Sequence, residues 1–284
     1  MNGFLNLYKP SGMSSNYVLT LIKRKFKGAK IGHMGTLDPL ASGVLPVAFG
    51  KSTRLFDFLL DKEKVYVAEF TFGYETDTLD RGGSVIKTSS VIPTIFEIED
   101  ALNKIVGVVD QIPPLYSAKN VNGKRSYDLA RNGVFVELKP KKVTINSVKL
   151  LEQISSISYK FLIKCKGGTY IRSIARDLAY NLNTVATMTA LERTKSGVFT
   201  IDNSKSIEEI LNLDVVNNIL IPPENVINFD KLILNSKNTS DLLNGRKFII
   251  DVENATYKVY GNNEFLGVGI VNNKNLTLKA FLKD

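Results

Sequence analysis

The sequence predicts an α+β fold, because strand-like and helix-like segments are mixed along the chain and no internal repeat is present. Residues 64–73, KVYVAEFTFG, alternate in side-chain character and indicate a half-buried strand. Two later segments carry apolar residues at helical spacing, and the tail holds several short strand-like runs. The predicted apolar face of the first strand comprises Tyr66, Ala68, Phe70 and Phe72.

The next elements are a helix over 94–107, a strand over 158–165 and a helix over 171–182. Thr94 and Glu97 have the spacing of a capping box, and Gly107 can close the first helix. Both helices show apolar stripes that predict a buried face. The stripes comprise Ile98, Ala101, Leu102 and Ile105 in the first helix and Ile171, Ile174, Ala175, Leu178 and Leu182 in the second.

A domain boundary is expected near residues 220–230, where Pro222 and Pro223 prevent a helix from continuing. Short strands follow, separated by turn signals such as Gly261-Asn262-Asn263 and Asn272-Asn273. The sequence therefore predicts a first domain over 1–223 and a small β-rich module over 224–284. The strands expected in this module are 247–251, 256–261, 264–271 and 276–282.

Composition narrows the class of protein. The single cysteine, Cys165, excludes an intramolecular disulfide and favours a reducing compartment. One Cys and one His cannot supply a zinc site of the Cys/His type. The first residues lack the charge and apolar pattern of a signal peptide, and no apolar run is long enough to span a bilayer. We therefore expect a cytoplasmic protein.

The charge balance points to a polyanionic partner. There are 37 Lys and Arg residues against 28 Asp and Glu residues, which gives a net charge of +9. Two segments concentrate this excess, residues 23–30 (KRKFKGAK) and residues 119–142. A basic surplus of this kind favours nucleic acid through neutralisation of phosphates, whereas a single basic run is usually a solvated face.

The stretch 32–54, GHMGTLDPLASGVLPVAFGKSTR, contains the only histidine, His33, and an aspartate placed directly before a proline. Pro39 suits the first turn of a helix over 40–44, which would make Asp38 its N-cap. A carboxylate at a helix N-terminus stays ionised, because the helix dipole and free N–H groups favour the anion. A cap is the simpler role for Asp38, but an ionised carboxylate on a rigid turn also suits a nucleophile or general base.

Five ordered motifs carry a resemblance to a known family. They are NLYKPSGMSS (6–15), GHMGTLDPLASGVLPVAFGKSTR (32–54), KVYVAEFTFGYETDTLDRGG (64–83), QIPPLYSAKNVNGKRSYDLAR (111–131) and GGTYIRSIARDL (167–178). Together they resemble the bacterial tRNA pseudouridine synthase B family, which isomerises uridine 55 in the T loop of tRNA. The resemblance implies a catalytic domain with a mixed, largely antiparallel sheet flanked by helices. It also implies a C-terminal module of the PUA-like, RNA-binding kind.

The resemblance implies roles for individual residues. Asp38 matches the catalytic aspartate, and Arg172 matches the arginine that pairs with it. His33 matches a histidine that contacts the RNA, and Lys9 lies in a segment that packs beside the pocket. From the residues alone, His33 is as readily structural, and Arg172 with Arg176 forms a plain helix face.

Three further residues match the lining of the base pocket. Tyr66 matches the tyrosine that stacks on the target base, although its strand face equally suits core packing. Tyr170 matches a second tyrosine of the pocket, and Leu191 matches a leucine that borders the base. Two positions depart from the family pattern: Met34 replaces a small polar residue, and Glu192 replaces a basic one.

The implied reaction needs no cofactor and no metal, because it is redox-neutral and transfers no external group. The target base must be flipped out of its stack, and aromatic stacking offsets part of that cost. The implied partner is the T arm of tRNA, and we expect a monomer without an obligatory protein partner.

Three alternatives stay open. The chain can be an RNA-binding protein without catalysis, or a related synthase acting on another uridine. Glu75, Asp77 and Asp80 can instead hold Mg²⁺ for a hydrolase, although such residues more often form turns.

Overall fold

The computed structural model describes residues 1–60, 62–117, 120–121, 124–125 and 138–283. Most of the predicted basic segment 119–142 lies outside these residues. Within the described chain no helix is both long and apolar enough to cross a bilayer.

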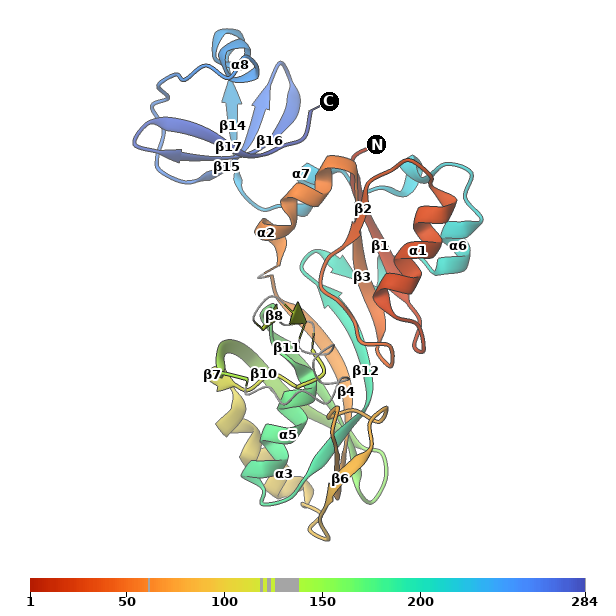
Figure 1. The fold of residues 1–284 in the computed structure, drawn as a ribbon. Helices are drawn as coiled ribbons and strands as arrows, with labels where there is room; N and C mark the ends of the chain where they lie inside the picture. The colour runs from red at the N-terminus through yellow and green to blue at the C-terminus, as the bar shows by residue number, and fades with distance from the viewer. Residues whose placement is uncertain (61, 118–119, 122–123, 126–137, 284) are drawn as a thin grey trace.

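A nine-stranded mixed sheet forms the body of the molecule (Figure 1). Its neighbours pair antiparallel except β3 and β12, which run parallel over two residue pairs. The predicted mixed, largely antiparallel sheet is therefore confirmed. In spatial order its strands are β1 (Gly3–Lys9), β3 (Ser42–Phe49), β12 (Ala186–Ser196), β4 (Lys64–Phe72), β11 (Ser158–Cys165), β10 (Lys141–Gln153) and β7 (Gly107–Gln111), with β2 (Ile31–His33) on β3 and β13 (Phe199–Thr200) on β12.

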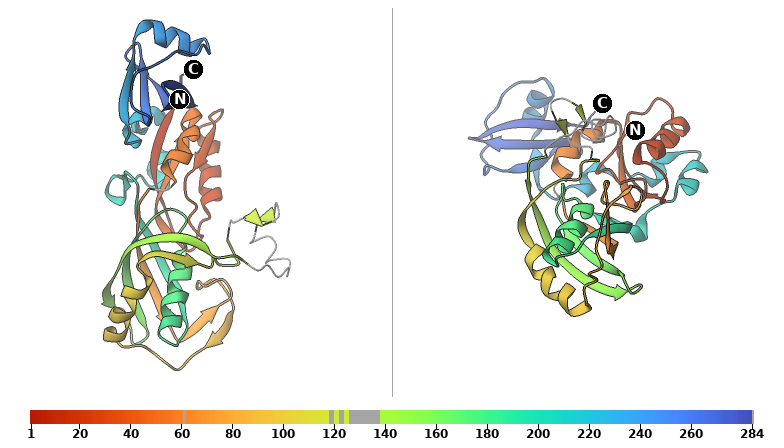
Figure 2. Two further views of the ribbon diagram at one scale, coloured as in Figure 1. Left: turned by 90° about the vertical axis from the view of Figure 1, so that its left-hand side faces the viewer. Right: turned by 60° about the horizontal axis from the view of Figure 1, so that its bottom comes forward.

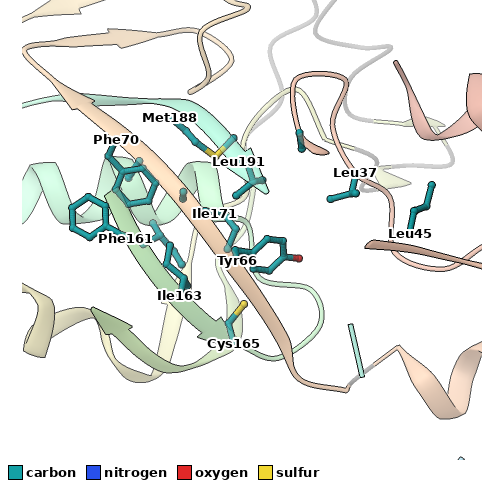
Figure 3. Close-up of a cluster of buried hydrophobic side chains, with 14 of the residues drawn as sticks. Leu37, Leu45, Tyr66, Phe70, Phe161, Ile163, Cys165, Ile171, Met188 and Leu191 are labelled. Carbon is teal, nitrogen blue, oxygen red and sulfur yellow. The ribbon is translucent and has the colours of Figure 1, made fainter. Parts of the chain in front are cut away.

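Four helices contribute to one continuous core against this sheet. They are α1 (Ser15–Lys25), α3 (Ile95–Leu102), α5 (Ile171–Asn181) and α6 (Ile207–Leu211). Phe70 and Phe161 stack at the centre of this core, with ring centroids 4.8 Å apart (Figure 3). The predicted inward face of 64–72 is confirmed, because its four residues are buried.

A second core covers the opposite face of β1 and β3. It joins Phe4, Val44 and Ala48 of these strands to α2 (Phe56–Leu59), α7 (Pro223–Val226) and the C-terminal strands. Consequently the C-terminal sheet lies at one end of the molecule and α3 and α5 lie at the other (Figure 2).

The C-terminal sheet has four strands and a separate small core. Its strands are β14 (Asp230–Leu234), β15 (Thr256–Gly261), β16 (Glu264–Asn272) and β17 (Asn275–Phe281), and α8 (Ser236–Leu243) follows β14. The two remaining described sheets are hairpins, β5 (Tyr74–Thr76) with β6 (Val85–Thr88) and β8 (Asn120–Val121) with β9 (Lys124–Arg125).

The structure corrects three local predictions. Residues 42–49 form β3 and not a helix over 40–44, because both faces of this apolar run are covered by a core. Residues 247–251 form no strand, since β14 takes the edge beside β15 and Ile249, 76% exposed, makes a single bridge to Asn275. The helix that begins after Thr94 has the predicted capping box but ends at Leu102. Gly107 therefore opens β7 and does not close that helix.

Candidate active site

Asp38 lies in the loop between β2 and β3, at the first position of a tight turn. Its carbonyl accepts the N–H of Ala41 at 3.0 Å, and Pro39 supplies the fixed φ that such a turn favours. The expected helix cap at Asp38 is therefore wrong, because no helix follows it. The backbone rigidity comes from the proline turn and from neighbouring segments.

Lys9 fixes this turn from the end of β1. Its fully buried ammonium donates to the carbonyls of Pro10 (2.9 Å), Met13 (2.6 Å) and Pro39 (3.4 Å). Burial lowers the pKa of Lys9 to about 8, which the nearby Asp38 carboxylate opposes. Lys9 thus joins the 10–13 segment to the turn that carries Asp38.

Arg172, at the start of α5, pairs with Asp38. Its Nε lies 2.9 Å from Asp38 Oδ2 and its Nη2 lies 3.2 Å from Oδ1, a bidentate arrangement. The guanidinium also donates to the carbonyls of Thr78 (2.9 Å) and Tyr116 (3.0 Å), and Nη1 lies 3.4 Å from Asp80 Oδ2. These contacts match the five N–H donors of arginine. The side chain is only 6% exposed and cannot swing away, while 34% of the Asp38 side chain stays exposed.

The electrostatics of Asp38 differ from those of a helix cap. Burial raises the pKa of the Asp38 carboxyl above its ordinary value, and Asp80 raises it further. The Arg172 guanidinium and the Lys9 ammonium oppose this shift. Arg172 is therefore the main group that favours the ionised form of a carboxylate placed in an unfavourable environment.

Tyr170 occupies the N-cap position of α5, two residues before Arg172. Gln111, at the end of β7, makes two hydrogen bonds to the backbone of Tyr170. The Tyr170 N–H donates to Gln111 Oε1 at 2.8 Å, and Gln111 Nε2 donates to the Tyr170 carbonyl at 3.1 Å. The half-buried Tyr170 therefore stands at a fixed point near Arg172.

Tyr66 and Leu191 lie on the neighbouring strands β4 and β12, where Tyr66 pairs with Arg193. Tyr66 is 6% exposed and its hydroxyl points toward the side of Leu37 and Leu45, away from the Phe70–Phe161 pair (Figure 3). Leu191 pairs with Ala68 and is also buried. Burial raises the pKa of the Tyr66 hydroxyl, and the Arg193 guanidinium beside it opposes the shift. In this structure Tyr66 packs in the core, so stacking on a base requires its neighbours to move.

His33 is the last residue of β2, five residues before Asp38. Its Nε2 lies 3.2 Å from Asn16 Oδ1, and its buried Nδ1 has no hydrogen-bond partner among the described residues. Burial lowers the pKa of His33, and the cations Arg193 and Lys23 lower it further. All three effects favour the neutral form of the ring.

Both departures from the family pattern have local partners. Met34 is buried in the second core, and the Glu192 carboxylate accepts the Tyr8 hydroxyl at 2.9 Å.

The acidic run forms turns. Asp77 accepts the N–H of Ser84, Asp80 accepts the N–H of Gly82 and Glu75 accepts the Tyr180 hydroxyl. Among the described residues no group of His, Cys, Asp and Glu has the geometry of a metal site.

Sequence reasoning missed three residues of the site. Gln111 and Arg193 were not singled out, and Asp80 was considered only as a metal ligand. Arg193 is 1% exposed and donates to the carbonyls of Val44 and Gly35, both at 2.8 Å. The one available signal was an arginine on the inward side of the strand that carries Leu191.

Comparisons with known proteins decide the family. Residues 23–171, which include the turn of Asp38 and reach Tyr170, match the TruB family pseudouridylate synthase (N-terminal domain). The chain belongs to the TruB family. The predicted resemblance and the enzyme class, an isomerase that forms pseudouridine, are thereby confirmed.

Relatives of the TruB family match this chain over nearly its full length. The tRNA pseudouridine synthase B of Clostridium novyi (strain NT) is 43% identical, covering 99% of this chain and all of that protein. The protein of the same name from Clostridium perfringens (strain 13 / Type A) is 39% identical, with 99% of both chains covered.

Solved structures share the TruB fold. One chain of a Cbf5–Nop10–Gar1 complex has a TM-score of 0.73 at 22% identity, covering 99% of this chain and 84% of its own. A chain of an H/ACA RNP bound to a substrate RNA containing 2′-deoxyuridine gives 0.73 at 21% identity, covering 99% and 85%. At this identity the likeness concerns the fold alone.

Proposed function

We propose that this chain converts uridine 55 in the T loop of tRNA to pseudouridine, with Asp38 as the catalytic nucleophile or base. One observation carries the proposal: a carboxylate on a rigid turn is paired bidentately with a buried arginine yet keeps a third of its side chain exposed. The tRNA substrate is supported by the relatives, which are named tRNA pseudouridine synthase B and match this chain over nearly their whole length.

The chemistry suits this group of residues. The N1–C1′ bond of uridine breaks, a C1′–C5 bond forms, C5 loses its proton and N1 takes up one proton, so atoms and electrons balance without an added reagent. A carboxylate can attack C1′, add to the base or remove a proton from C2′. Each of these steps needs an ionised Asp38, and the Arg172 guanidinium favours that form.

The target nucleotide reaches Asp38 only when it leaves its stack. We assign Tyr170, Tyr66 and Leu191 to the walls that receive the base, and His33 to an RNA contact on the same connection. The half-buried Tyr170 has an accessible side chain in this structure. Tyr66 becomes available only through a local shift, since it is buried here.

We further propose that residues 1–223 form the catalytic domain and residues 224–284 an RNA-binding module. The four strands after Asp230 enclose a core of their own, comprising Leu232, Leu234, Val259, Leu266 and Val271, which supports a separate unit.

The decisive test is incubation of the protein with an unmodified tRNA transcript, followed by chemical mapping of pseudouridine. We expect modification at position 55. Asp38→Asn retains size but can neither attack nor accept a proton, so pseudouridine formation falls below detection. We expect tRNA affinity and melting temperature to change little, because the substitution keeps the side-chain size and leaves the basic surface segments unchanged.

Near-normal turnover by Asp38→Asn contradicts the assignment of Asp38. Tight tRNA binding by the wild-type protein without pseudouridine at any position supports the alternative of an RNA-binding protein without catalysis.

A further inference from the structure

A surface hollow of about 450 Å³ lies at the end of the main sheet that faces the C-terminal module. It is bounded by the first residues of the chain, the loop from α1 to β2 and the turn Gly50–Leu55 after β3. Asp38 precedes the other end of β3. The strand runs from Ser42 to Phe49, and at about 3.3 Å per residue its length of about 23 Å separates the end near the hollow from the end near Asp38.

The lining of this hollow is strongly cationic. Lys27, Lys30, Lys51 and Arg54 contribute side chains, and none of the nine described lining residues is acidic or aromatic. The basic residues in the last turn of α1 are explained by the helix dipole. Lys27 and Lys30 follow the helix, so the dipole does not account for them.

Two of the cations are held in place by the C-terminal strand. Arg54 Nη1 donates to the Phe281 carbonyl at 2.8 Å, and Lys51 Nζ donates to the Lys283 carbonyl. Gly50 allows the turn after β3 to pack closely against the first residues of the chain, since a Cβ there would lie 2.2 Å from the Met1 carbonyl oxygen. The hollow is therefore a shaped site at the junction of the two sheets and not a loose run of surface lysines.

We propose that this hollow binds backbone phosphates of the substrate tRNA outside the stem-loop that carries the target uridine. The inference rests on the proposed function. Lysine and arginine without acidic neighbours suit phosphate, and the lack of an aromatic side chain gives a base nothing to stack on. The distance from Asp38 places the contact beyond the loop that enters the active site.

The test compares the wild-type protein with Lys27→Ala/Lys30→Ala, using full-length tRNA and an isolated T-arm stem-loop across a range of salt concentrations. Loss of two phosphate contacts reduces the log–log salt slope by about 2 and weakens full-length tRNA binding about 10- to 60-fold near 0.1 M salt. Stem-loop affinity stays unchanged, as does turnover at saturating tRNA. The matched control is Lys104→Ala/Lys149→Ala, which removes two exposed lysines outside both the hollow and residues 224–284. This control keeps the wild-type affinity.

Unchanged affinity and slope for full-length tRNA overturn the proposal, as does an equal loss from the control pair or for the stem-loop. Calorimetry with inorganic pyrophosphate tests whether the hollow binds a free phosphate ligand instead of tRNA phosphates. If pyrophosphate binds and the Lys27→Ala/Lys30→Ala protein loses only that binding, the hollow serves a small anion and the proposal is wrong. A wild-type protein that binds tRNA without forming pseudouridine contradicts the proposed function and leaves the binding comparison intact.

Discussion

A single guanidinium links two carboxylates at the centre of this molecule. Arg172 contacts Asp38 through two nitrogens and Asp80 through a third, and two backbone carbonyls take its remaining donors. Burial raises the pKa of the Asp38 carboxyl, and the fixed Arg172 guanidinium opposes that shift and favours the ionised form. Position and charge of Asp38 are thus set by the same side chain.

Arg172→Lys separates charge from geometry. Lysine retains the positive charge but loses the bidentate fork and the donors to Thr78 and Tyr116. We expect turnover to fall on the order of 100-fold, the scale of a small misplacement of a catalytic group, while some activity persists, unlike in Asp38→Asn. Single-turnover pseudouridine formation measures this. Arg176→Lys, one helical turn later, is the matched control and should stay near wild type, and an equal defect there contradicts the assignment.

His33 gives a pH prediction that a single resonance can report, because it is the only histidine. Burial lowers its pKa in the folded protein. Between that pKa and about 6.5 the unfolded chain binds more protons, so stability is lost as pH falls through this window. The imidazole signal in NMR should titrate below pH 6.5. Relative to His33→Gln, the wild-type free energy of unfolding should decrease from pH 7 to pH 5, and a constant difference contradicts the shift.

The sequence predicted which residues form the centre of the site but not all of the contacts that hold them. The resemblance paired Asp38 with Arg172, and the structure brings them to 2.9 Å. The clamp formed by Lys9 and the contact of Asp80 with Arg172 join segments distant in sequence, so no spacing rule reveals them. Tyr66 illustrates the opposite case, since its strand pattern predicted a core position and the structure has it buried.

At the scale of elements, period and length decided what was predictable. The strand 64–72 alternates over nine residues with one face buried, and α5 shows a long apolar stripe, so both follow from pattern. Residues 42–49 are covered on both faces and give a continuous apolar run, which periodicity cannot distinguish from a helix. Glycine is required at position 43, where β3 pairs with β12, since a Cβ there would lie 2.2 Å from the Arg193 carbonyl oxygen.

The contact between β7 and the start of α5 gives a prediction about elements. Gln111 is 2% exposed and its amide makes both hydrogen bonds to the Tyr170 backbone. Gln111→Ala leaves these groups unpaired, so we expect a loss of about 1–3 kcal/mol in the free energy of unfolding. Turnover should fall as well, because Tyr170 and Arg172 share the first turn of α5.

Denaturant unfolding and pseudouridine assays measure the two effects of Gln111→Ala. Gln153→Ala, which removes one exposed amide with a 3.4 Å contact, is the control and should change neither. A stable Gln111→Ala protein with full activity shows that the hydrogen bonds between Gln111 and Tyr170 do not position the site.

At the scale of the whole molecule, the charged pair of Asp38 and Arg172 lies apart from the basic surface segment 23–30. Arg172 is buried at the start of α5 and its partner Asp38 is half-buried, whereas the basic segment 23–30 lies on the surface at the end nearer the C-terminal module. Salt screens exposed charges beyond about 8–10 Å but affects buried pairs much less. The two kinds of interaction should therefore respond differently to ionic strength.

Salt should therefore change tRNA affinity far more than the chemical step. With a net charge of +9, contacts to about six phosphates predict an affinity loss of about 1,000-fold between 50 and 200 mM salt. Turnover at saturating tRNA should stay nearly constant over that range. The Arg172 side chain, only 6% exposed, pairs with Asp38 at a distance of 2.9 Å and is shielded from most counterions. Filter binding and single-turnover assays on one salt series measure both. A flat affinity contradicts recognition of a polyanion, whereas turnover that falls in step with affinity means that the Asp38–Arg172 pair is open to solvent when the nucleotide is bound.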